Sequence, residues 1–231
     1  MPNEDRSHET VQGKVLARAD VEALAAERVP RHLSGCDLER VDLSEMDLAG
    51  WTFETCNVRY GLFGNTKLEG SKWRSCRGAF AGFVGADLAD ASFSSSDFNN
   101  AGFRRATLTS TTFQSCKLTG ADFSDARTLD IRFDETQLIN AKLPSVSLRK
   151  CTLNRLDFGE ADLRKCDFRS AIFIDCSLRD ANIVGARFDG ADLRGADLGG
   201  MRLIDAAVFR GATISRHQAG DLLRELGLIV K

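Results

Sequence analysis

Histidine is scarce in this sequence, and its absence from most of the chain limits the chemistry available there. Only His8, His32 and His217 occur among 231 residues, so residues 33–216 contain none. A serine or cysteine nucleophile needs a neighbouring general base, which is most often histidine. We therefore expect no Ser-His-Asp or Cys-His arrangement, no catalytic residues and no enzymatic activity.

The chain also lacks a long apolar run and a strong excess of one charge. No segment approaches the roughly 18 apolar residues that a membrane-spanning helix needs, and the N-terminal MPNEDRSHET is polar. Lys and Arg total 31 against 33 Asp and Glu, which gives a net charge of −2. We expect a cytoplasmic protein that binds a protein partner and contacts neither a membrane nor nucleic acid directly.

What the sequence does contain is a large apolar residue at every fifth position. The series runs from Leu33 to Val208 over 36 positions, and only Gly78 and Thr128 interrupt it. It accounts for 13 of the 15 phenylalanines. The residue two positions earlier is usually small and the one directly before is often Asp, as in GADLRGADLGG at 190–200. Repetition at a fixed short period predicts a solenoid.

These A-D-L-x-x units resemble the pentapeptide-repeat protein family over about 180 of the 231 residues. The resemblance implies an all-β fold, a right-handed quadrilateral parallel β-helix in which four units form one square coil. The units then build about nine coils, at roughly 4.8 Å per coil, with a short helical cap at each end. We expect a polar tail and capping helix over 1–32, the β-helix over 33–212, and a capping helix and dimerisation tail over 213–231.

A coil of 20 residues places side chains 20 apart directly above one another. One predicted interior ladder therefore runs through Phe53, Trp73, Phe93, Phe113, Phe133, Leu153 and Phe173, and a second through Phe63, Phe83, Phe103 and Phe123. Stacked apolar ladders stabilise solenoids of this kind. We interpret both as core and assign them no role in cofactor binding.

All seven cysteines occupy the small position two residues before the large apolar one. They are Cys36, Cys56, Cys76, Cys116, Cys151, Cys166 and Cys176, and five of them share one column. Side chains in a column point in parallel, whereas a zinc site needs about four converging ligands. We predict no metal site and no cofactor. The rung spacing is compatible with disulfides, but a reducing compartment favours free thiols.

Two weak units and one proline mark departures from the regular repeat. Gly78 and Thr128 replace large apolar residues, so we expect local bulges or altered turns there. Pro144 follows Leu143 at a corner, where its fixed φ and missing N–H are tolerated.

The ends of the repeat carry helix signals. Residues 18–28 predict a short helix with Asp20 as its N-cap and with Val21, Leu24 and Ala25 on one face, while residues 1–14 are expected to lack a defined structure. Near the C-terminus, Ser215 and Gln218 predict a capping box and Gly227 a helix stop.

The final helix and tail either cap the last coil or also form a two-fold dimer contact. We favour the homodimer, because an isologous interface covers an otherwise exposed apolar tail. The dimerisation residues would be Leu222, Leu223, Leu226, Leu228, Ile229 and Val230. This ending resembles the dimerisation segment of the Qnr and MfpA-like members of the family, which protect DNA gyrase from quinolones.

That resemblance implies a DNA-mimic-type modulator or protector of DNA gyrase or topoisomerase IV, and so a role in resistance to quinolones or topoisomerase toxins. Residues 33–139 contain 15 acids and 11 bases, but residues 140–216 contain 10 acids and 13 bases, which weakens duplex mimicry. Arg104, Arg105, Arg164 and Lys165 interrupt any acidic stripe. The alternative is a structural adaptor in secretion, signalling or assembly.

Exposed apolar residues that fall outside the five-residue series could form the partner surface. We expect exposure of Tyr60, Phe80, Val84, Ile174, Val184, Ile204 and Phe209. Tyr60 and Phe80, with Arg104 and Arg105, are our candidates for the partner surface. A Ser/Thr face around Ser92 would suit ice or surface binding, but it covers too few coils.

Overall fold

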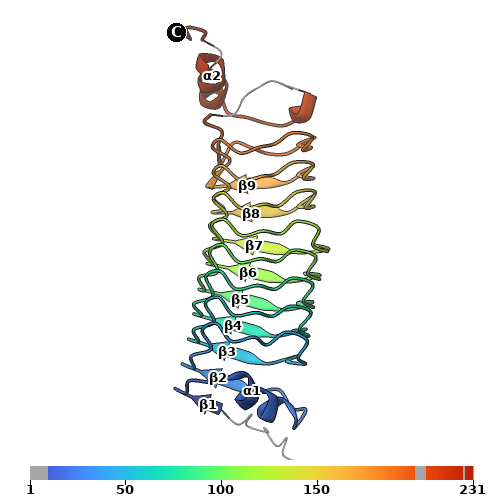
Figure 1. Ribbon diagram of the computed structural model, residues 1–231. Coiled ribbons are helices and arrows are strands. Elements are labelled where there is room, and N and C mark those ends of the chain that lie inside the picture. The colour runs from blue at the N-terminus through green and yellow to red at the C-terminus, as the bar shows by residue number, and fades with distance from the viewer. Residues whose placement is uncertain (1–9, 201–206, 226, 231) are drawn as a thin grey trace, which may run out of the picture.

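The computed structural model describes residues 10–200, 207–225 and 227–230. In these residues the chain winds into square coils that stack into a rod of about nine turns, with a short helix at each end (Figure 1). Residues 20 apart are paired in parallel, as Phe53 with Trp73 and Trp73 with Phe93. The predicted quadrilateral parallel β-helix is confirmed.

The strands of the described residues are short, at two or three residues each. One parallel sheet contains β1 (Thr10–Gln12), β2 (His32–Ser34), β3 (Thr52–Glu54), β4 (Lys72–Arg74), β5 (Ser92–Ser94), β6 (Thr112–Gln114) and β7 (Arg132–Asp134) in sequence order. Two smaller sheets pair β8 (Thr152–Asn154) with β9 (Ile172–Ile174), and β10 (Cys176–Ser177) with β11 (Ala196–Asp197). Isolated parallel bridges join the remaining sides.

The corners of the square are tight turns whose last central residue has positive φ at every fifth position from Gly35 to Gly200, with Gly195 as the exception. In the turn from Leu143 to Val146, the N–H of Val146 donates to the carbonyl of Leu143 at 3.3 Å and Ser145 has φ +63°. Pro144 precedes Ser145, which is the position that proline favours in a type II turn. The predicted corner placement of Pro144 is confirmed.

The interior consists of aromatic ladders that meet at right angles. Phe53 and Trp73 stack at 4.0 Å and Trp73 and Phe93 at 5.6 Å, while Phe63 and Phe83 stack at 4.8 Å in the second ladder. Between the ladders, Trp73 meets Phe63 at 87° and Phe83 at 88°. Both geometries are favoured by the ring quadrupoles, so the predicted core ladders are confirmed.

The two weak units behave differently. At Gly78 the coil is regular, since Gly78 N–H donates to Asp97 O at 2.6 Å and Ala81 N–H to Gly78 O at 3.0 Å. The expected bulge at Gly78 was wrong, because the ring of Phe98 from the next coil fills the volume that a side chain would take.

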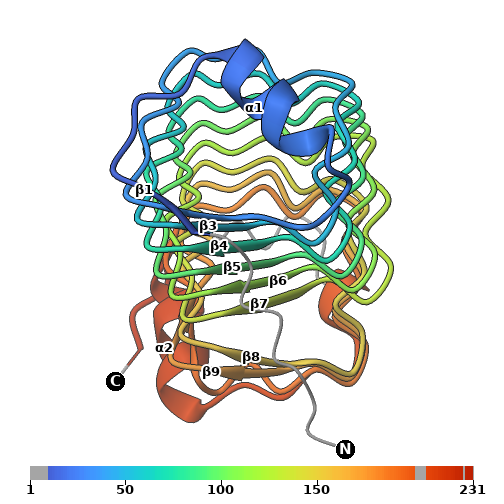
Figure 2. The ribbon, with the colours of Figure 1, turned by 90° about the horizontal axis from the view of Figure 1, so that it is seen from below.

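At Thr128 the backbone ladder opens. The N–H of Leu108 donates to Arg127 O at 2.7 Å and that of Leu148 to Asp167 O at 2.9 Å, but within the described chain the equivalent bond from Thr128 to Ser147 is missing. No strand pairing joins β7 to β8, and β8 and β9 lie displaced from the line of β1–β7 (Figure 2). The irregularity at Thr128 is not the expected bulge or altered turn, because the corner is regular: the N–H of Ile131 donates to Thr128 O at 3.3 Å and Asp130 has φ +55°. What changes is the bonding between the coils, and we call this opening the ladder gap.

Backbone pairing begins earlier than the repeat does. Residues 1–14 were expected to lack a defined structure, which was wrong for β1, because Val11 pairs with Leu33. Leu16 is buried, and its N–H donates to Asp37 O at 2.9 Å. The rod therefore includes residues from Thr10 onward, ahead of the expected start at residue 33.

Helix α1 (Arg18–Ala25) lies across the N-terminal end of the rod (Figure 2). Val21 is fully buried there, as predicted. The assignment of Asp20 as N-cap was wrong: Ala17 is the N-cap, and the Asp20 carboxylate accepts the N–H of Ala17 at 2.8 Å from the third helical position. An acidic residue is favourable at either place, so the sequence alone did not separate them.

Helix α2 (Arg216–Glu225) stands at the opposite end (Figure 1). Ser215 N–H donates to Gln218 Oε1 at 2.7 Å and Gln218 N–H to Ser215 Oγ at 3.2 Å, so the predicted capping box is confirmed. Gly227, at φ +80°, donates its N–H to Arg224 O at 2.8 Å and ends the helix as predicted. Neither α1 nor α2, the helices of the described chain, is long and apolar enough to cross a bilayer.

The last coil departs by one residue from the five-residue register. Phe209 stacks on Phe188 at 5.1 Å, and Phe188 N–H donates to Val208 O at 2.9 Å. The expected exposure of Phe209 was therefore wrong, since it packs against the core. The positive-φ corner residue is accordingly Gly211. Ile204, another predicted surface residue, lies outside the described residues.

Candidate protein-binding surface

The recurring aspartates form turns. Asp87 Oδ1 accepts the N–H of Ala89 at 3.1 Å, and Asp97 Oδ1 accepts that of Asn99 at 3.1 Å. The same bond to the residue two positions on recurs along the rod, and it is the usual way in which aspartate stabilises a tight turn. These carboxylates thus have a structural role at the corners.

The cysteine column is part of the interior. The thiol of Cys56 donates to Leu33 O at 3.3 Å and that of Cys76 to Phe53 O at 3.2 Å, and Ser96 continues the series with a bond to Trp73 O at 3.4 Å. All seven cysteines are free thiols. In the described residues no three His, Cys, Asp or Glu side chains gather as a metal site.

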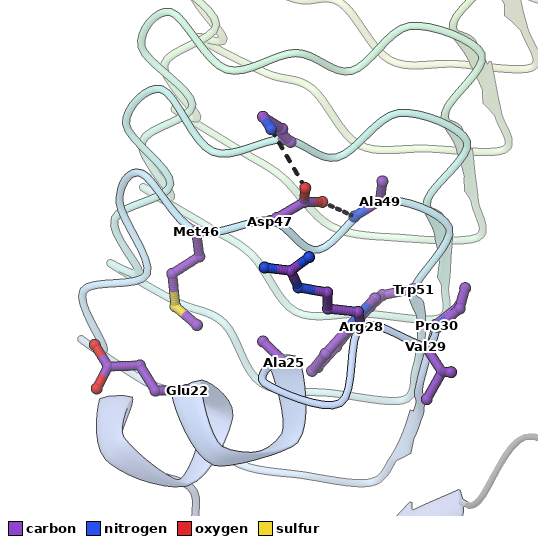
Figure 3. Close-up of a pocket in the computed structure, with 10 residues that line it drawn as sticks. Glu22, Ala25, Arg28, Val29, Pro30, Met46, Asp47, Ala49 and Trp51 are labelled. Atoms are coloured by element: carbon purple, nitrogen blue, oxygen red, sulfur yellow. Dashed lines mark hydrogen bonds and ion pairs between the residues drawn. The ribbon is translucent and has the colours of Figure 1, made fainter.

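A hollow of about 660 Å³ lies where α1 meets the first coils (Figure 3). Buried Met46 and Trp51 contribute apolar surface, and Arg28 and Asp47 are charged lining residues. Asp47 is already paired with Lys67 at 3.3 Å. The lining residues include no nucleophile next to a base, and the hollow is the seam between the cap and the coils.

Charges of opposite sign follow one another up the outside of the rod. Asp47 pairs with Lys67 at 3.3 Å, and Asp122 with Lys142 at 3.6 Å, each across one coil. Duplex DNA presents one negative charge per roughly 1.7 Å of its length. These columns therefore offer no continuous acidic stripe.

Two of the predicted partner-surface residues stack on the outside of the rod. The rings of Tyr60 and Phe80 are 5.0 Å apart and nearly parallel, at 3°, and the Arg40 guanidinium lies 4.6 Å from the Tyr60 ring centre. All three residues occupy one corner column at positive φ, which is strained for bulky side chains. Phe80 is 48% exposed, so a partner can reach the stack.

Further exposed apolar residues lie next to the stack, on the side of the square that follows the corner of Tyr60 and Phe80. Leu62 is 49% and Val84 38% exposed. Gly82 and Gly102 occupy the outward positions above Leu62 and leave the backbone bare there. We call Tyr60, Leu62, Phe80 and Val84 the aromatic patch.

The predicted arginines flank the aromatic patch. Arg104 belongs to the coil above Val84, where Gly85 N–H donates to Arg104 O at 3.0 Å, and Arg105 follows it at the same corner. Both are exposed, and neither forms an ion pair with a described residue. Tyr60 and Phe80 thus stack on each other at one corner, and Arg104 and Arg105 lie at the next corner, at the other end of the same side of the square.

Sequence reasoning missed Leu62 and Arg40 as members of this surface. Leu62 stands directly before Phe63, in the position that is often Asp in other units. An apolar residue at this outward position is a signal that could have identified it. Of the other expected surface residues, Ile174 is 41% and Val184 71% exposed.

The proposed dimerisation residues are unevenly exposed. Leu222 is only 8% exposed within the single chain, whereas Leu223 is 40%, Leu228 54% and Ile229 88% exposed. Val230 is half-buried, and Leu226 lies outside the described residues. An apolar tail that emerges beside α2 is therefore open to a partner.

Comparison with known families places the chain in a defined class of repeat solenoids. Residues 86–163 match the family described as "Pentapeptide repeat region", and residues 171–211 match that described as "Pentapeptide repeats (8 copies)". Together with the square coils, these matches show that the chain belongs to the pentapeptide-repeat family. A comparison with curated protein sequences gave no match.

Solved structures share the fold at low sequence identity. A trypsin-treated form of QnrB1, described as a plasmid-mediated fluoroquinolone resistance protein, is 23% identical, with a TM-score of 0.69 over 88% of this chain and 100% of that chain. HetL from Nostoc sp. strain PCC 7120, described as involved in heterocyst differentiation regulation, is 20% identical, with a TM-score of 0.40 over 85% of this chain and 94% of that chain. The likeness to QnrB1 shows a common fold.

Proposed function

We propose that this protein is a non-enzymatic, cytoplasmic binding protein that uses the aromatic patch to contact a type II topoisomerase, DNA gyrase or topoisomerase IV, and protects or modulates it. The observation that carries the proposal of a binding surface is the exposed stack of Tyr60 and Phe80 under Arg40. Aromatic residues and arginine are the residues that most often dominate protein interfaces.

The rod supports a role in presenting this surface. Stacked ladders such as Phe83 on Phe103, at 5.1 Å, join neighbouring coils into a continuous core. A rigid scaffold holds a patch in place and lowers the entropy lost when a partner binds. The chain therefore fits a protein that acts by occupying a surface of its partner.

The choice of partner rests on the shared fold and on the end of the chain. QnrB1 is a fluoroquinolone resistance protein, and fluoroquinolones act on type II topoisomerases. The alternating charges, such as Asp122 with Lys142, favour contact through the patch over mimicry of a whole DNA duplex. The exposed Leu228 and Ile229 support a homodimer through the C-terminal segment.

A structural adaptor is the second candidate function. It is favoured by another exposed apolar pair, Ile172 and Ile174, both on strand β9. An adaptor that joins two proteins needs two separate surfaces, and β9 lies several coils away from β3, which precedes Tyr60 in the chain (Figure 1). In this case neither surface need recognise a topoisomerase.

A DNA supercoiling assay separates the two functions. Purified gyrase is assayed with increasing amounts of this protein, with and without a quinolone. Protection from the drug or inhibition of supercoiling at micromolar protein supports the topoisomerase proposal. No effect in either arm at that concentration leaves the adaptor as the better account.

A further inference from the structure

The ladder gap leaves backbone groups without their usual partners. Arg132 N–H donates to Thr111 O at 2.9 Å and Ile172 N–H to Cys151 O at 3.0 Å, but within the described chain the matching bond from Thr152 to Ile131 is missing. The bonds from Thr128 to Ser147 and from Asp130 to Arg149 are missing as well. N–H groups that would join two coils are thus free to meet another acceptor.

Four cations surround this gap. Arg127, Arg132, Arg149 and Lys150 are all exposed, and none forms an ion pair with any residue in the described ranges. Asp130 is the one carboxylate residue between Arg127 and Arg132 in the sequence. In the coil above, by contrast, the Arg169 guanidinium is held by Asp167 at 2.8 and 2.5 Å. The four cations and Asp130 therefore leave a net positive charge at the gap.

An exposed leucine stands at the same corner. Leu129 is 68% exposed and lies between Arg127 and Asp130 in the chain. The charges of Arg132 and Asp130 both act on the half-buried thiol of Cys151. These two charged groups therefore lie near the same thiol at the gap. The surface combines cations, free backbone donors and one apolar side chain.

The cations, the free backbone N–H groups and Leu129 together indicate which kind of ligand this surface could bind. Guanidinium groups bind carboxylates in a two-pronged geometry, and free backbone N–H groups donate hydrogen bonds to carboxylate or carbonyl oxygens. A nucleic-acid backbone would satisfy the cations but would leave Leu129 exposed. An acidic polypeptide segment with an apolar side chain satisfies both.

We propose that the surface of Arg127, Leu129, Arg132, Arg149 and Lys150 at the ladder gap is a second interaction site, which binds an acidic polypeptide segment through carboxylates and one apolar side chain. Its corner column is half a coil, ten residues, from that of Tyr60 and Phe80. The two corners are therefore diagonally opposite on the square. The site is independent of the proposed function of the aromatic patch.

Titration of the full-length, isotope-labelled protein with a synthetic peptide tests this proposal. The probe is acetyl-Asp-Glu-Leu-Asp-Glu-Phe-Asp-amide, followed by amide chemical shifts in NMR spectra. A matched peptide has Ser in place of Leu and Phe, and a 12-base-pair DNA duplex forms the third arm. We expect saturable shifts at residues 127–132 and 147–152 with the acidic apolar peptide, and at least tenfold weaker binding of the serine peptide.

Two charge-reversal variants complete the experiment. R149E/K150E should weaken the binding of the apolar peptide at least tenfold. K72E/R74E, which reverses two exposed cations of β4 that form no ion pair within the described chain, should leave it unchanged. L129S retains every charge and should weaken binding severalfold without changing the salt dependence. The proposal is overturned if shifts at the gap are absent, if both charge-reversal variants lose binding equally, or if the DNA duplex binds there more tightly than the peptide.

Discussion

The ring of Phe98 occupies the space beside the α-carbon of Gly78, where a side chain at position 78 would otherwise lie. A β-carbon built on Gly78 would lie 2.1 Å from Cε1 of Phe98, far inside van der Waals contact. Gly78 is buried and its coil keeps its backbone hydrogen bonds. The missing side chain at this position is therefore a packing requirement of the ring above it.

Replacing Gly78 with alanine should destabilise the protein. The added methyl group forces the Phe98 ring out of its position, and overpacking of a core costs about 1–3 kcal/mol in free energy of unfolding. The measurement is chemical denaturation followed by circular dichroism. G102A is the matched control, because a β-carbon at Gly102 meets nothing within 4 Å. Equal stability of G78A and the unmodified protein would contradict the packing account.

The relation between Gly78 and Phe98 shows what the sequence could and could not predict. The five-residue period fixes which side chains point inward and which stack, because one backbone geometry repeats and forces residues 20 apart into register. Whether the ring of Phe98 fills the space beside Gly78 depends on how side chains of two neighbouring coils pack, and the residue type at one position does not determine this. For this reason a bulge was expected at Gly78 and none exists.

Three Asp-x-Arg pairs should make stability depend on pH. Side-chain hydrogen bonds from Arg164, Arg169 and Arg194 hold the pKa of Asp162, Asp167 and Asp192 below the ordinary 3.8, and that of Asp192 at about 2.

Because the pKa is lower in the folded state, the stabilisation by these pairs is complete above about pH 4 and is lost as the pH falls toward about 2. Urea denaturation at several pH values in this range should show the unmodified protein losing stability faster than D162N/D167N/D192N. Asparagine keeps the oxygen that accepts the turn N–H, so the corners are retained. Parallel pH profiles for the two proteins would contradict the prediction.

The interior thiols should be unreactive in the folded protein. Burial raises the pKa of Cys76 and Cys166 to about 12 and that of Cys56 to about 11, so few thiolates exist near neutral pH. Under brief treatment with iodoacetamide at pH 8, Cys151, which is half-buried, should be alkylated first. Mass spectrometry before and after addition of urea checks this. Alkylation of Cys76 as fast as Cys151, or a mass that shows paired cysteines, would be inconsistent with it.

Backbone exchange should locate the ladder gap. The N–H of Leu108 and of Leu148 are hydrogen-bonded to the coil above, at 2.7 and 2.9 Å, whereas that of Thr128 in the described chain is not. Hydrogen exchange measured by NMR should therefore be at least tenfold faster for Thr128 than for these two equivalent residues, because an unbonded amide needs no opening of the ladder. Uniform protection of the three amides would show that the gap is closed in solution.

The candidate surface was only partly predictable. Tyr60 and Phe80 were identified because both are apolar residues outside the five-residue series; that they stack at one corner is a finding of the structure. Leu62 was missed because it directly precedes Phe63, in a position where a polar residue is more usual. Thr128 marked a weak unit, but the opening of the ladder there and the displacement of β8 and β9 depend on the packing of whole coils, which the repeat pattern does not contain.

Binding of a type II topoisomerase by the aromatic patch can be measured directly with a variant that leaves the fold intact. Y60N/F80N removes both rings, and asparagine tolerates the positive φ of this corner, as Asn100 does at 57° in the same column. I172T/I174T, which alters the exposed apolar pair on β9, is the control.

The binding is measured by surface plasmon resonance with immobilised gyrase and topoisomerase IV. We predict saturable binding to at least one of the two enzymes at micromolar concentration, at least tenfold weaker for Y60N/F80N and unchanged for I172T/I174T. Absence of binding to both enzymes, or equal binding by Y60N/F80N at an unchanged melting temperature, would contradict the account.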